Sequence, residues 1–186
     1  MKISKGKTTY ILAKGVGRGT IRITDPDGDE LEMKQAVKYL GVWIDKKMKF
    51  RTHCQYAADK AKNQISRFRA VARARWGLKG KDLLTIYKTI FVPISVYCAG
   101  AWFPYATKRD VNRMAAAQRA ALLVVTRAYR TISGPALLVI AGVPHIRREL
   151  EKELLKQNVR KGTSVEIMGQ NFDPSANEGS TFKELL

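Results

Sequence analysis

Residues 37–45 read VKYLGVWID, residues 46–76 continue as KKMKFRTHCQYAADKAKNQISRFRAVARARW, and the change of pattern between them decides the fold. The first stretch is rich in the β-branched and aromatic residues that favour strands. In the second, apolar side chains from Cys54 to Trp76 recur at helical spacing and gather on one stripe. The chain is therefore expected to change from strand to helix near residues 45–50.

Upstream of this change, short segments predict three or four antiparallel strands within residues 7–45. Residues 8–14 (TTYILAK) are rich in β-branched and aromatic side chains, and residues 20–24 (TIRIT) alternate cleanly. Residues 25–28 (DPDG) form a strong turn signal, because Asp-Gly readily adopts the left-handed conformations of hairpin turns. Residues 31–33 and 37–44 complete the predicted strands.

Downstream, the segment 83–105 is almost uncharged and about as long as a membrane span. Pro93 lies in its middle, and Gly100 and Pro104 lie near its end. We interpret the segment as a buried helix of a globular protein, interrupted at Pro93. A transmembrane helix is the alternative.

Helix-capping residues delimit the elements that follow. Thr107 and Asp110 resemble a capping box, which predicts a helix from Lys108 to about Arg130. Ser133 is the expected N-cap of a short helix that ends near Gly142. A last helix is expected from about Pro144 through the sequence IRRELEKELLKQN, and the Gly-, Ser- and Asn-rich chain beyond Gly162 is expected to have little order.

Together these patterns predict an α+β fold, in which a small antiparallel β-hairpin sheet precedes a mostly α-helical bundle. The expected division is residues 1–48 for the sheet, 49–161 for the helical domain and 162–186 for a flexible tail.

The charge distribution indicates the class of partner. The 186 residues carry 34 Lys or Arg against 16 Asp or Glu, a formal charge of +18. Residues 46–81 alone contain twelve basic residues and one acid, Asp59. Such a surface favours nucleic acid, whose phosphates it can neutralise with release of counterions. Membrane surfaces and calmodulin-like partners also take basic amphipathic helices, and charge alone leaves them open.

No complete active site or metal site is apparent in the sequence. The two cysteines, Cys54 and Cys98, are too few for a disulfide framework or a zinc site, and His53 and His145 stand alone. The N-terminus has no secretory signal pattern. These observations favour an intracellular location, in the cytoplasm or the nucleus.

Three stretches share the pattern of one family. They are ISKGKT at 3–8, KYLGVWID at 38–45, and a long third stretch comprising Gln118-Arg119, AYRTIS at 128–133, AL at 136–137 and AGVP at 141–144. The sequence resembles, over about residues 1–155, the region that follows the catalytic aspartates in reverse transcriptases of non-LTR retrotransposons, particularly the insect type-1 elements.

The resemblance implies a role in RNA-directed DNA synthesis. Lys7 would lie at the edge of the polymerase palm near the incoming nucleotide, Lys38 to Val42 would form the hairpin that holds the 3′ end of the primer, and the basic helices would form the thumb. The expected partners are an RNA–DNA or DNA template–primer and the remainder of the polymerase, without a membrane. The residues expected to contact nucleic acid are Lys7, Lys38, Tyr39, Leu40, Gly41, Lys60, Lys62, Arg67, Arg69, Arg73 and Arg130.

The catalytic carboxylates of the family, with their aromatic-x-Asp-Asp signature, precede this region and are absent from the sequence. Because two-metal phosphoryl transfer needs those acids, the chain alone is expected to be inactive and to bind no cofactor. Mg²⁺ is expected for the complete polymerase. A standalone basic nucleic-acid-binding module and a membrane-associated protein that uses segment 83–105 are the alternative functions.

Overall fold

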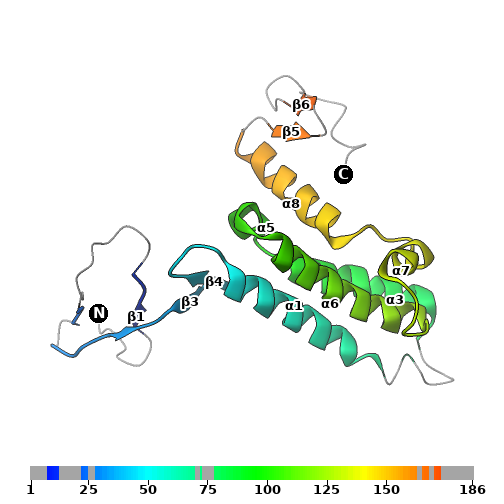
Figure 1. Cartoon of the computed structure of the whole chain (residues 1–186), viewed down its shortest axis with the longest axis horizontal. Helices are drawn as coiled ribbons and strands as arrows, with labels where there is room; N and C mark the ends of the chain where they lie inside the picture. Colours follow the sequence, from blue (N-terminus) through cyan, green and yellow to red (C-terminus); the bar gives the residue numbers. More distant parts are fainter. Residues whose placement is uncertain are drawn as a thin grey trace.

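The computed structural model describes residues 8–12, 22–24, 28–69, 72, 78–162, 165–167 and 170–172. Short strands near the N-terminus lead through a hairpin into a group of packed helices (Figure 1). The predicted α+β class is confirmed.

Strands β3 (Ala36–Tyr39) and β4 (Val42–Asp45) form an antiparallel hairpin, as the family resemblance implied. The single strand predicted over residues 37–44 was wrong, because the chain turns at Leu40 and Gly41. These two turn residues have φ angles of 45° and 87°. Two successive positive φ angles match the right-handed twist of the flanking strands. The second of them falls on glycine, which adopts such angles without strain.

The prediction of three or four antiparallel strands was wrong in its pairing. β1 (Thr9–Tyr10) and β2 (Glu32–Met33) are two residues long each and pair in parallel. The isolated antiparallel bridge between Thr24 and Glu30 lies within the connection that joins them. Alternation of side chains sets which face a residue occupies but not the direction of its partner strand, so the pattern could not distinguish the two pairings.

Helix α1 (Arg51–Ser66) begins directly after the hairpin and buries the predicted apolar stripe, including Cys54, Ala61 and Ile65. Phe50, at its N-cap, has a left-handed backbone (φ 54°) and a buried side chain. Burial raises the pKa of the Cys54 thiol to about 12, so this cysteine stays protonated and unreactive.

The predicted break of the apolar segment at Pro93 was wrong, because the helical run continues through this residue. The segment comprises α3 (Gly80–Ile86), the π-helical turn η1 (Tyr87–Phe91), α4 (Val92–Val96), α5 (Ala99–Trp102) and the 3₁₀ turn η2 (Phe103–Tyr105).

Pro93 was expected to interrupt a helix because its ring collides with the carbonyl four residues earlier. Instead, the π turn widens the backbone, with the N–H of Val92 bonded to the carbonyl of Tyr87, five residues back. The helix therefore passes through Pro93. The break comes at Tyr97 and Cys98, where Cys98 is left-handed (φ 51°).

By length and composition, Gly80–Tyr105 is also apolar enough to cross a membrane, with 28% of its most apolar window buried. The buried core helices of soluble proteins pass the same test. In the structure, Tyr87 and Phe91 of this run are buried and stack on each other with ring centroids 5.1 Å apart.

Two predicted helix starts, those of α6 and α7, are confirmed by their caps. Thr107 and Asp110 form both bonds of a capping box at the start of α6 (Lys108–Thr126). The Ser133 hydroxyl accepts the N–H of Ala136 at the start of α7 (Gly134–Ala141), which ends at the left-handed Gly142. α6 ends earlier than the predicted Arg130, because Arg127 adopts a left-handed conformation (φ 55°) and stops it.

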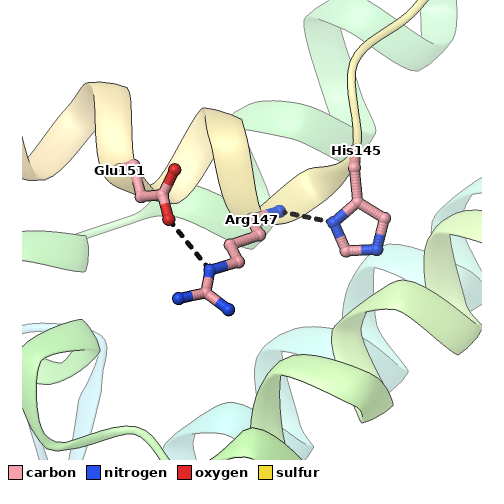
Figure 2. A network of polar contacts seen from close by, with 3 residues as sticks. All are labelled: His145, Arg147 and Glu151. Atoms are coloured by element: carbon pink, nitrogen blue, oxygen red, sulfur yellow. Dashed lines mark hydrogen bonds and ion pairs between the residues drawn. The ribbon is translucent and has the colours of Figure 1, made fainter. Parts of the chain in front are cut away.

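Helix α8 (Ile146–Arg160) starts beside Pro144, as expected, with His145 as its N-cap. The Nδ1 atom of His145 accepts the backbone N–H of Arg147 at 3.2 Å, and the side chain of Arg147 pairs with Glu151 at 2.9 Å (Figure 2). His145 thus has a structural role at this helix end.

A buried hydrogen-bond network lies where α6 meets the π turn and the start of α8. Gln118 of α6 is buried there, and its amide donates to the Tyr87 hydroxyl at 2.9 Å and to the Pro144 carbonyl at 2.8 Å. Its carbonyl oxygen accepts the N–H of Ile146 at 2.8 Å. Burial raises the pKa of Tyr87 to about 12, so the phenol stays neutral. One glutamine therefore fixes three elements relative to each other.

Beyond α8, within the tail expected to have little order, the structure contains a short antiparallel hairpin. It pairs β5 (Val165–Ile167) with β6 (Gln170–Phe172).

Candidate nucleic-acid interface

Helices α1 and α6 lie side by side and run in the same direction (Figure 1). Between their C-terminal halves lies an open cavity of about 540 Å³. Basic side chains dominate it, and no acid is among the described residues that line it. The cations are Lys62, Arg69, Arg119, Arg127 and Arg130.

A second cavity of about 570 Å³ lies between the N-terminal halves of the same helices. Arg51, Arg109 and Arg113 contribute cations, and Asp59 contributes an exposed carboxylate. Asp110 also lines it, but its carboxylate is buried and bonded to Thr107. Negative charge is therefore concentrated at this end of the helix pair.

We name the surface formed by both cavities the α1–α6 seam. The 19 residues of α6 give it a length of about 28 Å at 1.5 Å per residue. A row of cations on this scale can contact several successive phosphates. Its basic residues are Arg51, Lys62, Arg69, Arg109, Arg113, Arg119, Arg127 and Arg130.

Two seam arginines are held by backbone carbonyls. Arg119 donates from one terminal nitrogen to the carbonyls of Arg130 at 2.7 Å and Ile132 at 2.9 Å. Arg127 donates to the carbonyl of Leu78, in the segment that precedes α3. A guanidinium has five N–H donors, so each arginine retains donors for a phosphate while its position is fixed.

A second basic cluster lies on the other side of α1, beside the β3–β4 hairpin, and we call it the hairpin flank. The ammonium of Lys38 donates to the Tyr56 hydroxyl at 3.2 Å and lies 4.8 Å from the centre of its ring. Lys60 lies 5.7 Å from the same ring. These cations lower the pKa of Tyr56, the hydrogen bond from Lys38 most strongly. The three side chains share an open cavity of about 420 Å³ with Gly41 and Tyr97.

Two contacts fix the hairpin on this flank. The Tyr97 hydroxyl donates to the carbonyl of Leu40 at 2.9 Å, and the backbone N–H of Trp43 donates to Nδ1 of His53 at 3.4 Å. His53 is buried against Trp102, and desolvation lowers its pKa. A neutral imidazole is what this position requires, because only the neutral ring can accept a hydrogen bond.

The structure divides the predicted binding residues between the two surfaces. Lys60 and Lys62 are two positions apart on α1, so their side chains leave the helix about 160° apart. Lys62, Arg69 and Arg130 lie in the seam, and Lys38, Gly41 and Lys60 lie on the hairpin flank.

The remaining predicted residues have different positions. Tyr39 and Leu40 are 64% and 75% exposed at the hairpin tip. Arg67 is exposed at the C-cap of α1, about 20° around the helix from Lys60. Lys7 and Arg73 lie outside the described residues.

Sequence reasoning missed Arg119 and Arg127 as binding candidates. The spacing of basic residues within α1 indicated one side of the seam, but not which helix supplies the other. Arg119 was visible only as part of the Gln118-Arg119 motif, and Arg127 was not singled out. In the described part of the chain, no group of three or more His, Cys, Asp or Glu could hold a metal ion.

Known proteins share this sequence over most of its length. The chain is 32% identical to the Retrovirus-related Pol polyprotein from type-1 retrotransposable element R1 4 of Nasonia vitripennis, covering 91% of this chain and 47% of the relative. It is 32% identical to the Retrovirus-related Pol polyprotein from type-1 retrotransposable element R1 of Bradysia coprophila, covering 99% of this chain and 19% of the relative.

The Putative 115 kDa protein in type-1 retrotransposable element R1DM of Drosophila melanogaster is 29% identical over 88% of this chain and 16% of its own length. The chain thus spans half or less of each of these relatives. No family model and no solved structure matches it. The chain is therefore homologous to a segment of the Pol polyproteins of type-1 non-LTR retrotransposable elements, as the sequence resemblance predicted.

Proposed function

We propose that this chain binds the template–primer for a retrotransposon reverse transcriptase, as the thumb and the adjoining edge of the palm. In this proposal it grips an RNA–DNA or DNA duplex, and the chemistry with Mg²⁺ belongs to carboxylates that precede this region in the family. The remainder of the polymerase is its protein partner, inside the cell and away from membranes.

The observation that carries the proposal is the α1–α6 seam. Its C-terminal half presents five cations and no acid among its described lining residues, on a protein with a formal charge of +18. Its lysines and arginines contact phosphates, which fix a duplex in place without reading its base edges. Binding by phosphate contact alone has little sequence preference, as a polymerase that copies any template requires.

The direct test is a fluorescence-anisotropy titration of the full chain with an RNA–DNA hybrid across salt concentrations. A seam that contacts several phosphates predicts affinity that falls by at least about 100-fold between about 50 and about 200 mM salt. Affinity that does not change with salt would contradict phosphate contact.

The double variant Lys62→Glu/Arg69→Glu tests whether the seam is the binding site. It should lower affinity by about 100-fold and flatten the salt dependence, because two phosphate contacts are replaced by repulsion. The matched control, Arg148→Glu/Arg160→Glu, makes the same charge change at two exposed residues of α8. Equal losses in the two variants would show that only net charge matters and that the seam is not the binding site.

A further inference from the structure

The loop between α6 and α7 exposes an aromatic ring at the edge of the seam. Tyr129 is 82% exposed, although its neighbours Ala128 and Arg130 both line the seam cavity. An exposed tyrosine contributes little to the core, so its position there is not explained by folding. Cationic residues precede and follow it in the loop, at Arg127 and Arg130.

The backbone that carries Tyr129 is fixed by hydrogen bonds. The carbonyl of Tyr129 accepts the N–H of Ile132 at 3.1 Å, and the N–H of Ala128 donates to the Thr126 hydroxyl at 3.4 Å. The two carbonyls that Arg119 holds, those of Arg130 and Ile132, belong to the same loop. The ring is therefore presented from an ordered turn, which lowers the entropy cost of a contact.

We propose that Tyr129 stacks on an unpaired base of a single strand that extends from the duplex held in the seam. The proposal rests on the proposed function, because the seam must hold the duplex whose extension reaches the loop. An aromatic ring among cations is the combination that binds single-stranded nucleic acid, since the ring stacks on a base while the cations contact its phosphates. The bases inside a duplex already stack on each other, so the unpaired base is the ligand.

A protein partner is the other class of molecule that an exposed tyrosine could contact. The surroundings favour nucleic acid, because the cavity beside Tyr129 is lined by five cations and by no acid among its described residues. A protein that covered this loop would have to neutralise the same cations. The test treats protein contact as an outcome that overturns the proposal.

The experiment compares a blunt RNA–DNA hybrid with the same hybrid carrying a short single-stranded extension, both titrated against the full chain. A 2-aminopurine in the extension reports stacking through its fluorescence. The wild-type chain should bind the extended hybrid about tenfold more tightly, and Tyr129→Ala should abolish this preference without changing affinity for the blunt hybrid. Tyr129→Phe, which keeps the ring, should retain the preference and the 2-aminopurine signal.

Val139→Ala serves as the matched control, because Val139 is also 82% exposed but lies on α7. Tight binding of both hybrids without a preference would overturn the stacking proposal and leave the proposed function standing. A preference that survives in Tyr129→Ala would overturn it in the same way, assign the preference to another part of the chain and leave Tyr129 available for a protein partner. If the folded wild-type chain, checked by circular dichroism, binds neither hybrid, the proposed function fails and this proposal falls with it.

Discussion

The two flanks of α1 carry similar charges but are built differently. On the seam side, cations from α1 face cations from α6, and two arginines are held by backbone carbonyls. On the hairpin side, Lys38 and Lys60 share one tyrosine ring, and the hairpin is fixed by Tyr97 and His53. Exposed, uncharged Asn63 and Ser66 lie on α1 between the flanks, and Tyr56 lines a cavity on each of them.

This difference shows how one basic helix can contribute to two separate basic surfaces. A single run of Lys and Arg in sequence becomes two sites because its members lie on both sides of the buried stripe. Each site then depends on a different neighbour, α6 for the seam and the hairpin for the other flank. Variants that disturb one neighbour should therefore leave the other flank intact.

The largest expected effect is on the seam, in Arg119→Met. The change removes a charged donor from two carbonyls and should lower the free energy of unfolding by about 3 kcal/mol, since hydrogen bonds from charged groups are worth about 1.5–3 kcal/mol each. Chemical denaturation measures the loss. Hydrogen exchange should quicken in residues 128–132 and stay unchanged in the hairpin; faster exchange in both would show that the flanks are not independent.

A smaller effect is expected at the hairpin turn, in Gly41→Ala. The φ of Gly41 is 87°, and a Cβ added there would lie 3.1 Å from Cε1 of Tyr97. Backbone strain and crowding together should lower the free energy of unfolding by about 2 kcal/mol. Gly142→Ala is the matched control, because its φ is 61° and no atom lies within 4 Å of the added Cβ. In chemical denaturation, the control should lose about 1 kcal/mol of its free energy of unfolding. Equal losses of stability in the two variants would mean that the Tyr97 ring moves aside without a measurable change in free energy.

Tyr97→Phe should cost about 1 kcal/mol, because it removes one hydrogen bond to the carbonyl of Leu40 and leaves the ring in place. Hydrogen exchange of the β3–β4 hairpin is the sensitive measurement. Tyr105→Phe, at a ring that packs on Phe50, provides the control. An unchanged hairpin in Tyr97→Phe would show that the contacts of His53 and Tyr56 with the hairpin are sufficient to hold it.

The smallest effect is a pH dependence confined to the hairpin flank. Burial places the pKa of His53 in the folded chain below its value of 6.5 in the unfolded chain, so the unfolded chain binds the proton more readily. The stability contributed by neutral His53 is therefore complete above pH 6.5 and is lost as the pH falls toward the folded pKa. The backbone of Tyr97 raises the pKa of His53, but by less than burial lowers it.

Hairpin hydrogen exchange, measured from about pH 7 to about pH 5 and corrected for intrinsic rates, checks this dependence. His53→Gln, which retains an acceptor but does not titrate, should flatten it. The same slope in the variant would assign the pH dependence to another group.

Local signals account for what the sequence predicted well. The capping box at Thr107, the Ser133 N-cap and the end of α7 at Gly142 each depend on residues within one turn of the helix, so the pattern was sufficient. The β3–β4 hairpin followed from the family resemblance, whereas the local pattern predicted one strand over residues 37–44. The buried stripe of α1 followed from its spacing alone.

Non-local geometry accounts for what the sequence did not predict. The π turn before Pro93 is an adjustment of the backbone that no residue type signals, and the parallel pairing of β1 with β2 joins residues far apart in the chain. The candidate site shows the same limit. Three of the five cations at the acid-free end of the seam were predicted, namely Lys62, Arg69 and Arg130. Arg119 and Arg127, from α6 and its C-cap, were not.

By itself, the sequence determined the fold class, most of the helix boundaries, the strongly basic character and the kinship with type-1 retrotransposon polyproteins. These properties depend on composition and on short-range spacing. Only the tertiary structure decided which cations face one another, because the partner of a helix flank is set by packing between segments distant in sequence. The packing of α1 against α6 therefore produced the seam and the edge that presents Tyr129, and the packing of α1 against the β3–β4 hairpin produced the hairpin flank.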